Sequence, residues 1–190
     1  MKTRLLAPVL LLPLALVPTA GAATPGASSA AFFSMKVHAG HDYEVEVLGA
    51  RPTSGAPVVE LLVRDLTADG NDVRYEGAPE SLSLTDTKAT LTASVGGQPL
   101  AVTWTADDGI TAGGGDALVG PVPTLGFTTA GKHADVSVAL GGLRCRPSAF
   151  GEIGYAVGDS NPGAQPLTAA LAGLDLGKAT CSDVDYSSVP

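Results

Sequence analysis

The stretch from Thr90 to Trp104 reads TLTASVGGQPLAVTW, and this stretch decides the fold class. Apolar side chains occupy every second position on both sides of a glycine pair: Leu91, Ala93 and Val95 before it, and Leu100, Val102 and Trp104 after it. A period of two is typical of a strand with one buried face, and adjacent glycines suit a tight hairpin turn. The sequence therefore predicts a β-hairpin that turns at Gly96-Gly97 and buries Trp104.

Segments with the same alternation recur along the rest of the chain. They cover residues 33–38, 43–47, 59–63, 73–75, 81–84 and 136–145, the last with a turn at Gly141-Gly142. Short strands separated by Gly or Pro turns are typical of an all-β domain, so we expect an antiparallel β-sandwich, immunoglobulin-like or related, with about 8–10 short strands. The order Cys-Trp-Cys of immunoglobulin domains is absent, because Trp104 precedes both cysteines.

Three segments interrupt this regular pattern. Between residues 167 and 181, three leucines have the i, i+4, i+7 spacing of a helix, whereas Gly173 and Gly177 suit a hairpin. We expect a hairpin there, with a short helix as the alternative. The Asp- and Gly-rich stretch 107–115 is expected to be a loop, and Pro121 and Pro123 limit the stretch 118–127 to a short or edge strand.

The first residues have the features of a secretory signal peptide. Lys2 and Arg4 precede an apolar run, Leu5 to Val17, that is too short to span a membrane readily. Small residues follow, so we expect cleavage after Ala22, with cleavage after Ala23 as the alternative. The predicted organisation is a signal peptide over 1–22, a flexible lead-in over 23–30, one sandwich domain over 31–186 and a tail over 187–190. The mature protein is expected in the medium or the cell envelope, with no membrane span.

The charge of the chain excludes one class of partner. Eleven basic residues against nineteen acidic ones give a formal net charge of −8 at pH 7. Such a chain cannot neutralise a phosphate backbone, so nucleic acid is not an expected partner.

The only two cysteines are Cys145 and Cys181. In an oxidising compartment two such thiols usually pair, and neither has a neighbouring Cys or His at metal-ligand spacing. We therefore expect a disulfide, which stabilises the fold by about 4 kcal/mol in the chain-entropy model.

Two groups of residues are candidate metal ligands. His38 and His41 flank a predicted turn, and with His133 they could bind Zn²⁺ or Cu²⁺ if the fold brought all three together. A second group falls on the ligand positions of a calcium loop that ends in a bidentate carboxylate: Asp65, Thr67, Asp69, Asn71 and Glu76, with Gly70 at the turn. Soluble loop histidines and an acidic hairpin turn are the alternative interpretations of these two groups.

Catalytic motifs are missing from the sequence. There is no G-x-S-x-G elbow, and no Gly-rich stretch is followed by the Lys-Ser/Thr of a phosphate-binding loop. The leading hypothesis is a secreted or envelope-associated, non-enzymatic interaction module for an extracellular protein or glycan, with no resident cofactor and a surface near residues 109–115 and 121–123. A metal-binding envelope protein is the second hypothesis, and a secreted hydrolase of unrecognised type is the third.

Overall fold

The computed structural model describes residues 28–53, 55–67, 72–111, 127–146, 151–158 and 164–182. These residues form strands and one short 3₁₀ helix, which confirms the predicted all-β class. The elements are β1 (Ser28–His38), β2 (Asp42–Arg51), β3 (Val58–Asp65), β4 (Asp72–Gly77), β5 (Ser81–Leu84), β6 (Lys88–Val95), β7 (Gln98–Thr111), β8 (Phe127–Leu140), β9 (Leu143–Cys145), β10 (Glu152–Gly158), β11 (Gln165–Pro166), η1 (Leu167–Ala169) and β12 (Thr180–Ser182).

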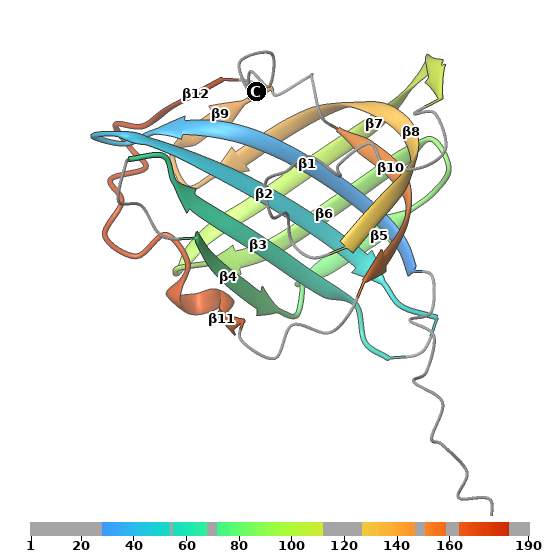
Figure 1. Cartoon of the computed structure of the whole chain (residues 1–190), viewed down its shortest axis with the longest axis horizontal. Coiled ribbons are helices and arrows are strands. Elements are labelled where there is room, and N and C mark those ends of the chain that lie inside the picture. The colour runs from blue at the N-terminus through green and yellow to red at the C-terminus, as the bar shows by residue number, and fades with distance from the viewer. Residues whose placement is uncertain are drawn as a thin grey trace, which may run out of the picture.

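The strands form one hydrogen-bonded sheet that curls back on itself (Figure 1). Its order is β11-β4-β3-β2-β1-β10-β8-β7-β6-β5, with β12 added to β1 and β9 added to β8. The sequence led us to expect a sandwich of two separate sheets. Instead, β10 pairs with both β1 and β8, so the two facing halves belong to one continuous open sheet.

The predicted hairpins are present in the structure. β6 and β7 pair from Val95↔Gln98 to Lys88↔Thr105, and both turn glycines have positive φ, 57° at Gly96 and 77° at Gly97. The hairpins β1–β2 and β8–β9 also form. The predicted loop at 107–115 was wrong in its first part, because β7 continues to Thr111. Residues 112–126, which include Pro121 and Pro123, lie outside the described residues.

The main core fills the space between the two halves of the sheet. Trp104 of β7 is fully buried, its ring lies 5.8 Å from that of Phe33 in β1, and its Nε1–H donates to the Phe32 carbonyl at 2.9 Å. Elsewhere Leu82 of β5 reaches Gly49 of β2, where an added Cβ would lie 3.1 Å from Leu82 Cδ1. The two facing halves of the sheet are therefore in contact at both of these places.

The C-terminal segment differs from the predicted hairpin. Residues 167–169 form the 3₁₀ helix η1, turns follow, and only 180–182 form a strand, β12. The hairpin was wrong because Leu167, Ala170, Leu171 and Leu176 pack into the main core, where they replace strand pairing with burial. The predicted disulfide is confirmed: Cys145 of β9 is bonded to Cys181 of β12, with the two Cα atoms 5.8 Å apart.

The predicted signal peptide and the tail 187–190 lie outside the described residues. β1 begins at Ser28, inside the segment expected to be a lead-in. Where the structure is described, it contains no helix of the length and apolarity that a membrane crossing requires.

Candidate functional site

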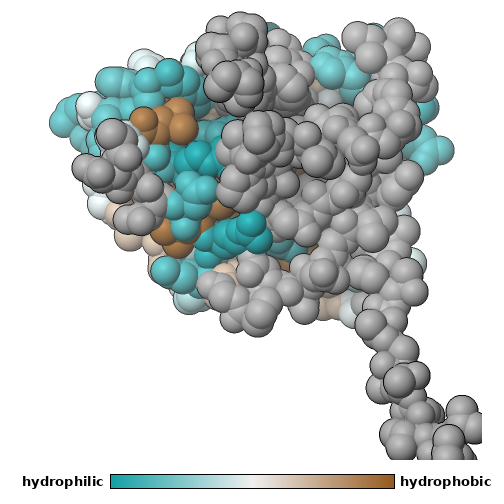
Figure 2. Space-filling model, in the orientation of Figure 1, coloured by the Kyte–Doolittle hydropathy of each residue, from teal (hydrophilic) through white to brown (hydrophobic). Residues whose placement is uncertain are grey.

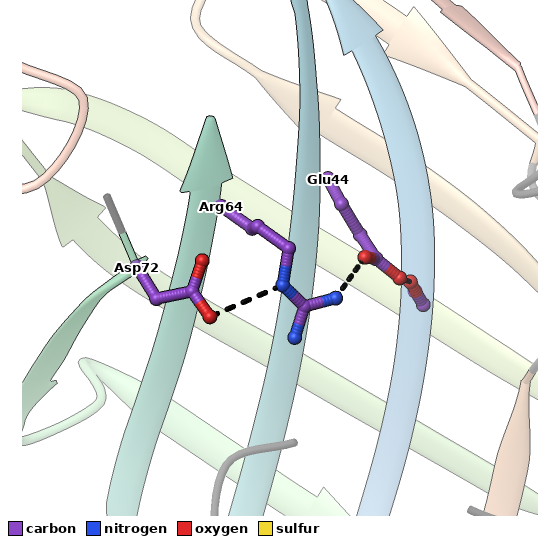
Figure 3. A network of polar contacts seen from close by, with 4 residues as sticks. Glu44, Arg64 and Asp72 are labelled. Carbon is purple, nitrogen blue, oxygen red and sulfur yellow. Dashed lines mark hydrogen bonds and ion pairs between the residues drawn. The ribbon is translucent and has the colours of Figure 1, made fainter. Parts of the chain in front are cut away.

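The main polar network lies on the outer face of the sheet, away from the core. Register places Glu44 of β2 opposite Arg64 of β3, and Arg64 opposite Asp72 of β4. Arg64 Nη1–H donates to Glu44 Oε2, and Arg64 Nε–H donates to Asp72 Oδ2 at 3.2 Å (Figure 3). On the other side, Ser34 Oγ donates to Glu44 Oε1 at 3.1 Å. Four strands thus contribute one connected row of polar side chains.

Most of this network is shielded from water. Ser34 is 1% exposed and Glu44 is 4% exposed, while Asp72 lies at the exposed end of the row. Burial opposes the charge of Arg64, but the carboxylates of Glu44 and Asp72 outweigh it and hold the pKa of the guanidinium above its ordinary value. The buried carboxylate of Glu44 is therefore matched by a cation, and it also accepts a hydrogen bond from the hydroxyl of Ser34.

Two carboxylates face each other further along the same face. Glu60 of β3 pairs directly with Glu76 of β4. Burial, together with the charge of Glu76, raises the pKa of Glu60 to about 7, while Arg74 opposes the shift. Burial, with the neighbouring carboxylate as the second cause, makes Glu60 a group that can titrate near neutral pH.

The turn end of the β1–β2 hairpin carries two His–Asp pairs. His38 Nδ1 lies 2.8 Å from Asp42 Oδ1, and Lys36 Nζ lies 2.6 Å from Asp42 Oδ2. The hydrogen bonds from Lys36 and His38 lower the pKa of Asp42 below its usual value. The side chains of Lys36, His38 and Asp42 are all at least partly exposed.

The second pair joins β3 to the same turn. His41 Nε2 lies 3.1 Å from Asp65 Oδ2, and the His41 ring packs on Tyr43 with ring centroids 4.3 Å apart. The backbone N–H of Thr67 also donates to Asp65 Oδ1 at 2.9 Å, and it is the largest cause of a lowered pKa at Asp65. Burial, and then the charge of Asp65, raise the pKa of Tyr43.

The fold does not bring His133 to the other two histidines. His133 pairs with Glu152 of β10, and Glu152 pairs with Phe32 of β1. His38 lies six residues further along β1, which corresponds to about 20 Å of strand. In the described part of the chain no group of three or more His, Cys, Asp or Glu side chains is placed to hold a metal.

The candidate calcium ligands are also divided. Asp69, Gly70 and Asn71 lie outside the described residues. Glu76, expected as the closing ligand, pairs with Glu60, and Glu60 is five residues from Asp65 on β3, about 16 Å along the strand. The structure instead joins one residue from each predicted metal group, His41 and Asp65.

The network of Ser34, Glu44, Arg64 and Asp72 was not predicted from the sequence. Glu44 falls on the polar side of an alternating strand, where a solvated side chain is the ordinary expectation. The missing information was the register between strands, which sets Glu44, Arg64 and Asp72 in one row. Opposite charges at alternating positions of consecutive strands are the signal that could have indicated it.

Comparisons of this chain with protein-family models, with curated proteins and with solved structures found no match. We therefore infer function from the residues and their contacts. Figure 2 shows hydrophilic residues at the left end of the molecule, where the β1–β2 turn lies in Figure 1.

Proposed function

We propose that the chain is an exported, non-enzymatic interaction module that binds an extracellular protein or glycan. In this proposal the curled sheet works as a sandwich of the immunoglobulin type does, with two facing layers as a rigid support and turns as the binding surface. The signal peptide over 1–22 and secretion are part of the same proposal.

One observation carries the non-enzymatic reading. In the described part of the chain, His38 and His41 contact the carboxylates of Asp42 and Asp65, and the hydroxyl of Ser34 donates to a carboxylate as well. Nucleophilic catalysis needs a hydroxyl or thiol within hydrogen-bond reach of an available base, whereas the Glu44 carboxylate that accepts from Ser34 is already ion-paired with Arg64. Both cysteines are joined in the disulfide, so neither supplies a thiolate. These polar contacts favour structural support over bond-breaking chemistry.

The turn end of the first hairpin is the surface we propose for binding. We call the hairpin end the group His38, His41, Asp42, Asp65 and Leu66. Leu66 is the one large hydrophobic residue found exposed among the described residues, at 43%, and the side chains of His38 and His41 are 59% and 41% exposed. The Leu66 N–H donates to the Asp42 carbonyl at 2.9 Å, which holds the β3 side of the surface against the turn. A fixed apolar side chain beside exposed imidazoles offers both contact area and hydrogen bonds.

The experiment compares two exposed surfaces of one protein. The mature chain is tested on a glycan array and by cross-linking on the surface of producing cells. A variant carrying His38→Ser, His41→Ser and Leu66→Ser is expected to lose the bound partner. The control is Asp175→Ala with Lys178→Ala, which removes an exposed ion pair elsewhere and is expected to retain binding. A folded hairpin-end variant that keeps every partner would refute this surface.

A weak metal site is a second candidate, because His41 and Asp65 come together in the structure. Their contact at 3.1 Å joins an imidazole and a carboxylate, and both groups ligate Zn²⁺. A complete site would need ligands beyond those two. Thermal melts of the mature protein with EDTA, and then with Zn²⁺, Cu²⁺ or Ca²⁺, test this, since an ion that binds only the folded state raises the melting temperature. A response to an ion that disappears in Asp65→Asn would favour this candidate.

A further inference from the structure

The C-terminal segment 164–182 runs from β4 past the β6–β7 turn to β1; we call it the strap. It pairs with β4 through the two residues of β11, and the Leu167 carbonyl accepts from the Gly96 N–H of the β6–β7 turn at 3.1 Å. Leu167 also packs tightly on β4, where a Cβ added at Gly77 would lie 2.9 Å from Leu167 Cβ. The strap therefore bridges β4 and the β6–β7 hairpin, which do not pair with each other in the described sheet.

The contact between the strap and the β6–β7 turn requires glycine at position 96. A Cβ added at Gly96 would lie 2.2 Å from the Ala170 carbonyl oxygen, and Gly96 also has a positive φ of 57°. The strap approaches the hairpin turn more closely than any side chain would allow. Its apolar residues Leu167, Ala170, Leu171 and Leu176 enter the main core from this position.

The strap carries local strain and has few hydrogen bonds to the sheet. Leu171, at φ 57°, is the only non-glycine residue with positive φ in the described chain. A leucine holds this conformation only when its surroundings impose it. Four of the strap's turn hydrogen bonds are made to other strap residues, and they are donated by Ala170, Leu174, Leu176 and Lys178. The sheet thus restrains the strap mainly by burial and at its two ends.

The far end of the strap crosses a seam in the sheet. β12 pairs with β1 at Lys36–His38, and β9 pairs with β8, but no strand pairing joins β12 to β9 in the described residues. The Cys145–Cys181 disulfide spans this seam. Cys145 is 6% exposed, whereas Cys181 is only partly buried, so a reductant can approach from the strap side.

From these observations we infer that the disulfide is a redox-sensitive latch that holds the strap over the open side of the core. A dithiol reductant, either a small molecule or a protein with a Cys-x-x-Cys pair, attacks Cys181 Sγ as its thiolate. A mixed disulfide forms while Cys145 leaves as a thiolate and takes up a proton. The second reductant thiolate then displaces Cys181, so the latch gains two electrons and two protons and the reductant becomes a disulfide. Release lets Leu171 relax and uncovers apolar core surface, while the strands outside the strap remain paired with one another.

Amide hydrogen exchange tests the latch on the mature protein, oxidised or treated with dithiothreitol. Exchange in residues 164–182 is expected to become about tenfold faster or more after reduction, while the β6–β7 hairpin and β2–β3 keep their protection. The double variant Cys145→Ala with Cys181→Ala is expected to show the same pattern without reductant. Reoxidation of the wild-type protein should restore slow exchange in the strap.

The control variant Lys178→Ala changes an exposed strap residue and keeps the disulfide. It is expected to exchange as slowly as the oxidised wild type. Two results overturn the inference. One is unchanged exchange in 164–182 on reduction, which means that the packing of the strap suffices without the latch. The other is loss of protection throughout the sheet, which means that the disulfide holds the whole fold rather than the strap.

Discussion

The two halves of the curled sheet treat their outer faces differently. In the half formed by β1–β3, polar side chains on the outer face are buried, with Ser34, Glu44 and Glu46 at 1%, 4% and 1% exposure. In the half formed by β6 and β7, the outer face carries Thr90, Thr92 and Thr103, all half-buried, and the exposed Ser94 and Thr105. Both halves have the same alternation in sequence, so alternation alone does not reveal how far an outer face is shielded from water.

The chemistry of each outer face matches its environment. The β1–β3 face carries a second apolar cluster, separate from the main core: Ala30, Phe32, Leu48, Ala50 and Leu62. Beside that cluster a carboxylate must have a strong partner, because an uncompensated buried charge is costly, and Arg64 supplies one to Glu44. The β6–β7 face needs no such pairing, since small hydroxyl side chains remain in reach of water. The following changes test this difference, beginning with the residue that links both halves.

The largest expected effect follows from Trp104→Ala. Trp104 packs on Phe33 and donates to the Phe32 carbonyl, so it joins β7 to β1 across the core. Large-to-small changes at such positions lower the free energy of unfolding by about 3–5 kcal/mol. Urea unfolding measures the loss, and Trp104→Phe, which keeps most of the packing, should cost less than half as much. A loss under about 1 kcal/mol for Trp104→Ala would mean that the two halves do not depend on this contact.

Arg64→Met is expected to have the next largest effect. Methionine keeps much of the volume of the side chain but removes the cation beside the buried Glu44 carboxylate. Removing one partner of a buried ion pair costs about 3 kcal/mol or more.

A double-mutant cycle shows whether the charge is responsible. Adding Glu44→Gln to Arg64→Met should restore part of the lost stability, because the orphaned charge is then gone. Thr103→Val on the other half serves as the control and should change stability by about 0.5 kcal/mol or less. If the double variant is no more stable than Arg64→Met, the stability of the buried outer face of β1–β3 does not depend on the ion pair.

A third prediction concerns pH. Because the pKa of Glu60 is raised from 4.5 to about 7, the folded state keeps the proton on Glu60 up to a higher pH than the unfolded state does. The contribution of Glu60 to the free energy of unfolding is therefore complete below pH 4.5 and is lost as the pH rises to about 7. Allowing for partial solvation, the loss is about 1–2 kcal/mol.

The neutral variant Glu60→Gln isolates this group. It should be more stable than the wild type at pH 8 and of similar stability at pH 4. Urea unfolding across this range measures both. Equal pH dependence of the two proteins would assign the titration to other groups.

The fold could be predicted from sequence where the pattern is local. The hairpin at Gly96-Gly97 and the pairing of Cys145 with Cys181 depend on spacing within short stretches or on the absence of other partners, and both are confirmed. The single curled sheet depends on β10 pairing with β1 and β8 at once, which alternation cannot encode. The strap was misread for a similar reason, because the burial of its leucines comes from distant strands.

The candidate site was harder to predict than the fold. His38 and His41 lie at the turn end of the β1–β2 hairpin, whereas His133 lies in β8, where the register of β8, β10 and β1 separates it from them. His41 and Asp65 were placed in different hypothetical sites, although the β2–β3 pairing brings them into contact. Register is the common missing quantity, because a shift of one residue would exchange the inner and outer faces of a strand.

The smallest expected effects come from Ser34→Ala and Ser81→Ala, each of which removes one hydroxyl oxygen. Ser34 Oγ donates to Glu44 on the buried face, whereas Ser81 Oγ lies 2.8 Å from Thr92 Oγ1 at an exposed position next to β6. Ser34→Ala should cost about 1–2 kcal/mol, because it withdraws a donor from a buried carboxylate. Ser81→Ala should cost about 0.5 kcal/mol or less, since water can replace the hydroxyl. Denaturant unfolding of both variants under one condition gives the difference directly. If the two costs are equal, burial of the outer face does not set the strength of its hydrogen bonds, and the two halves of the sheet are energetically alike.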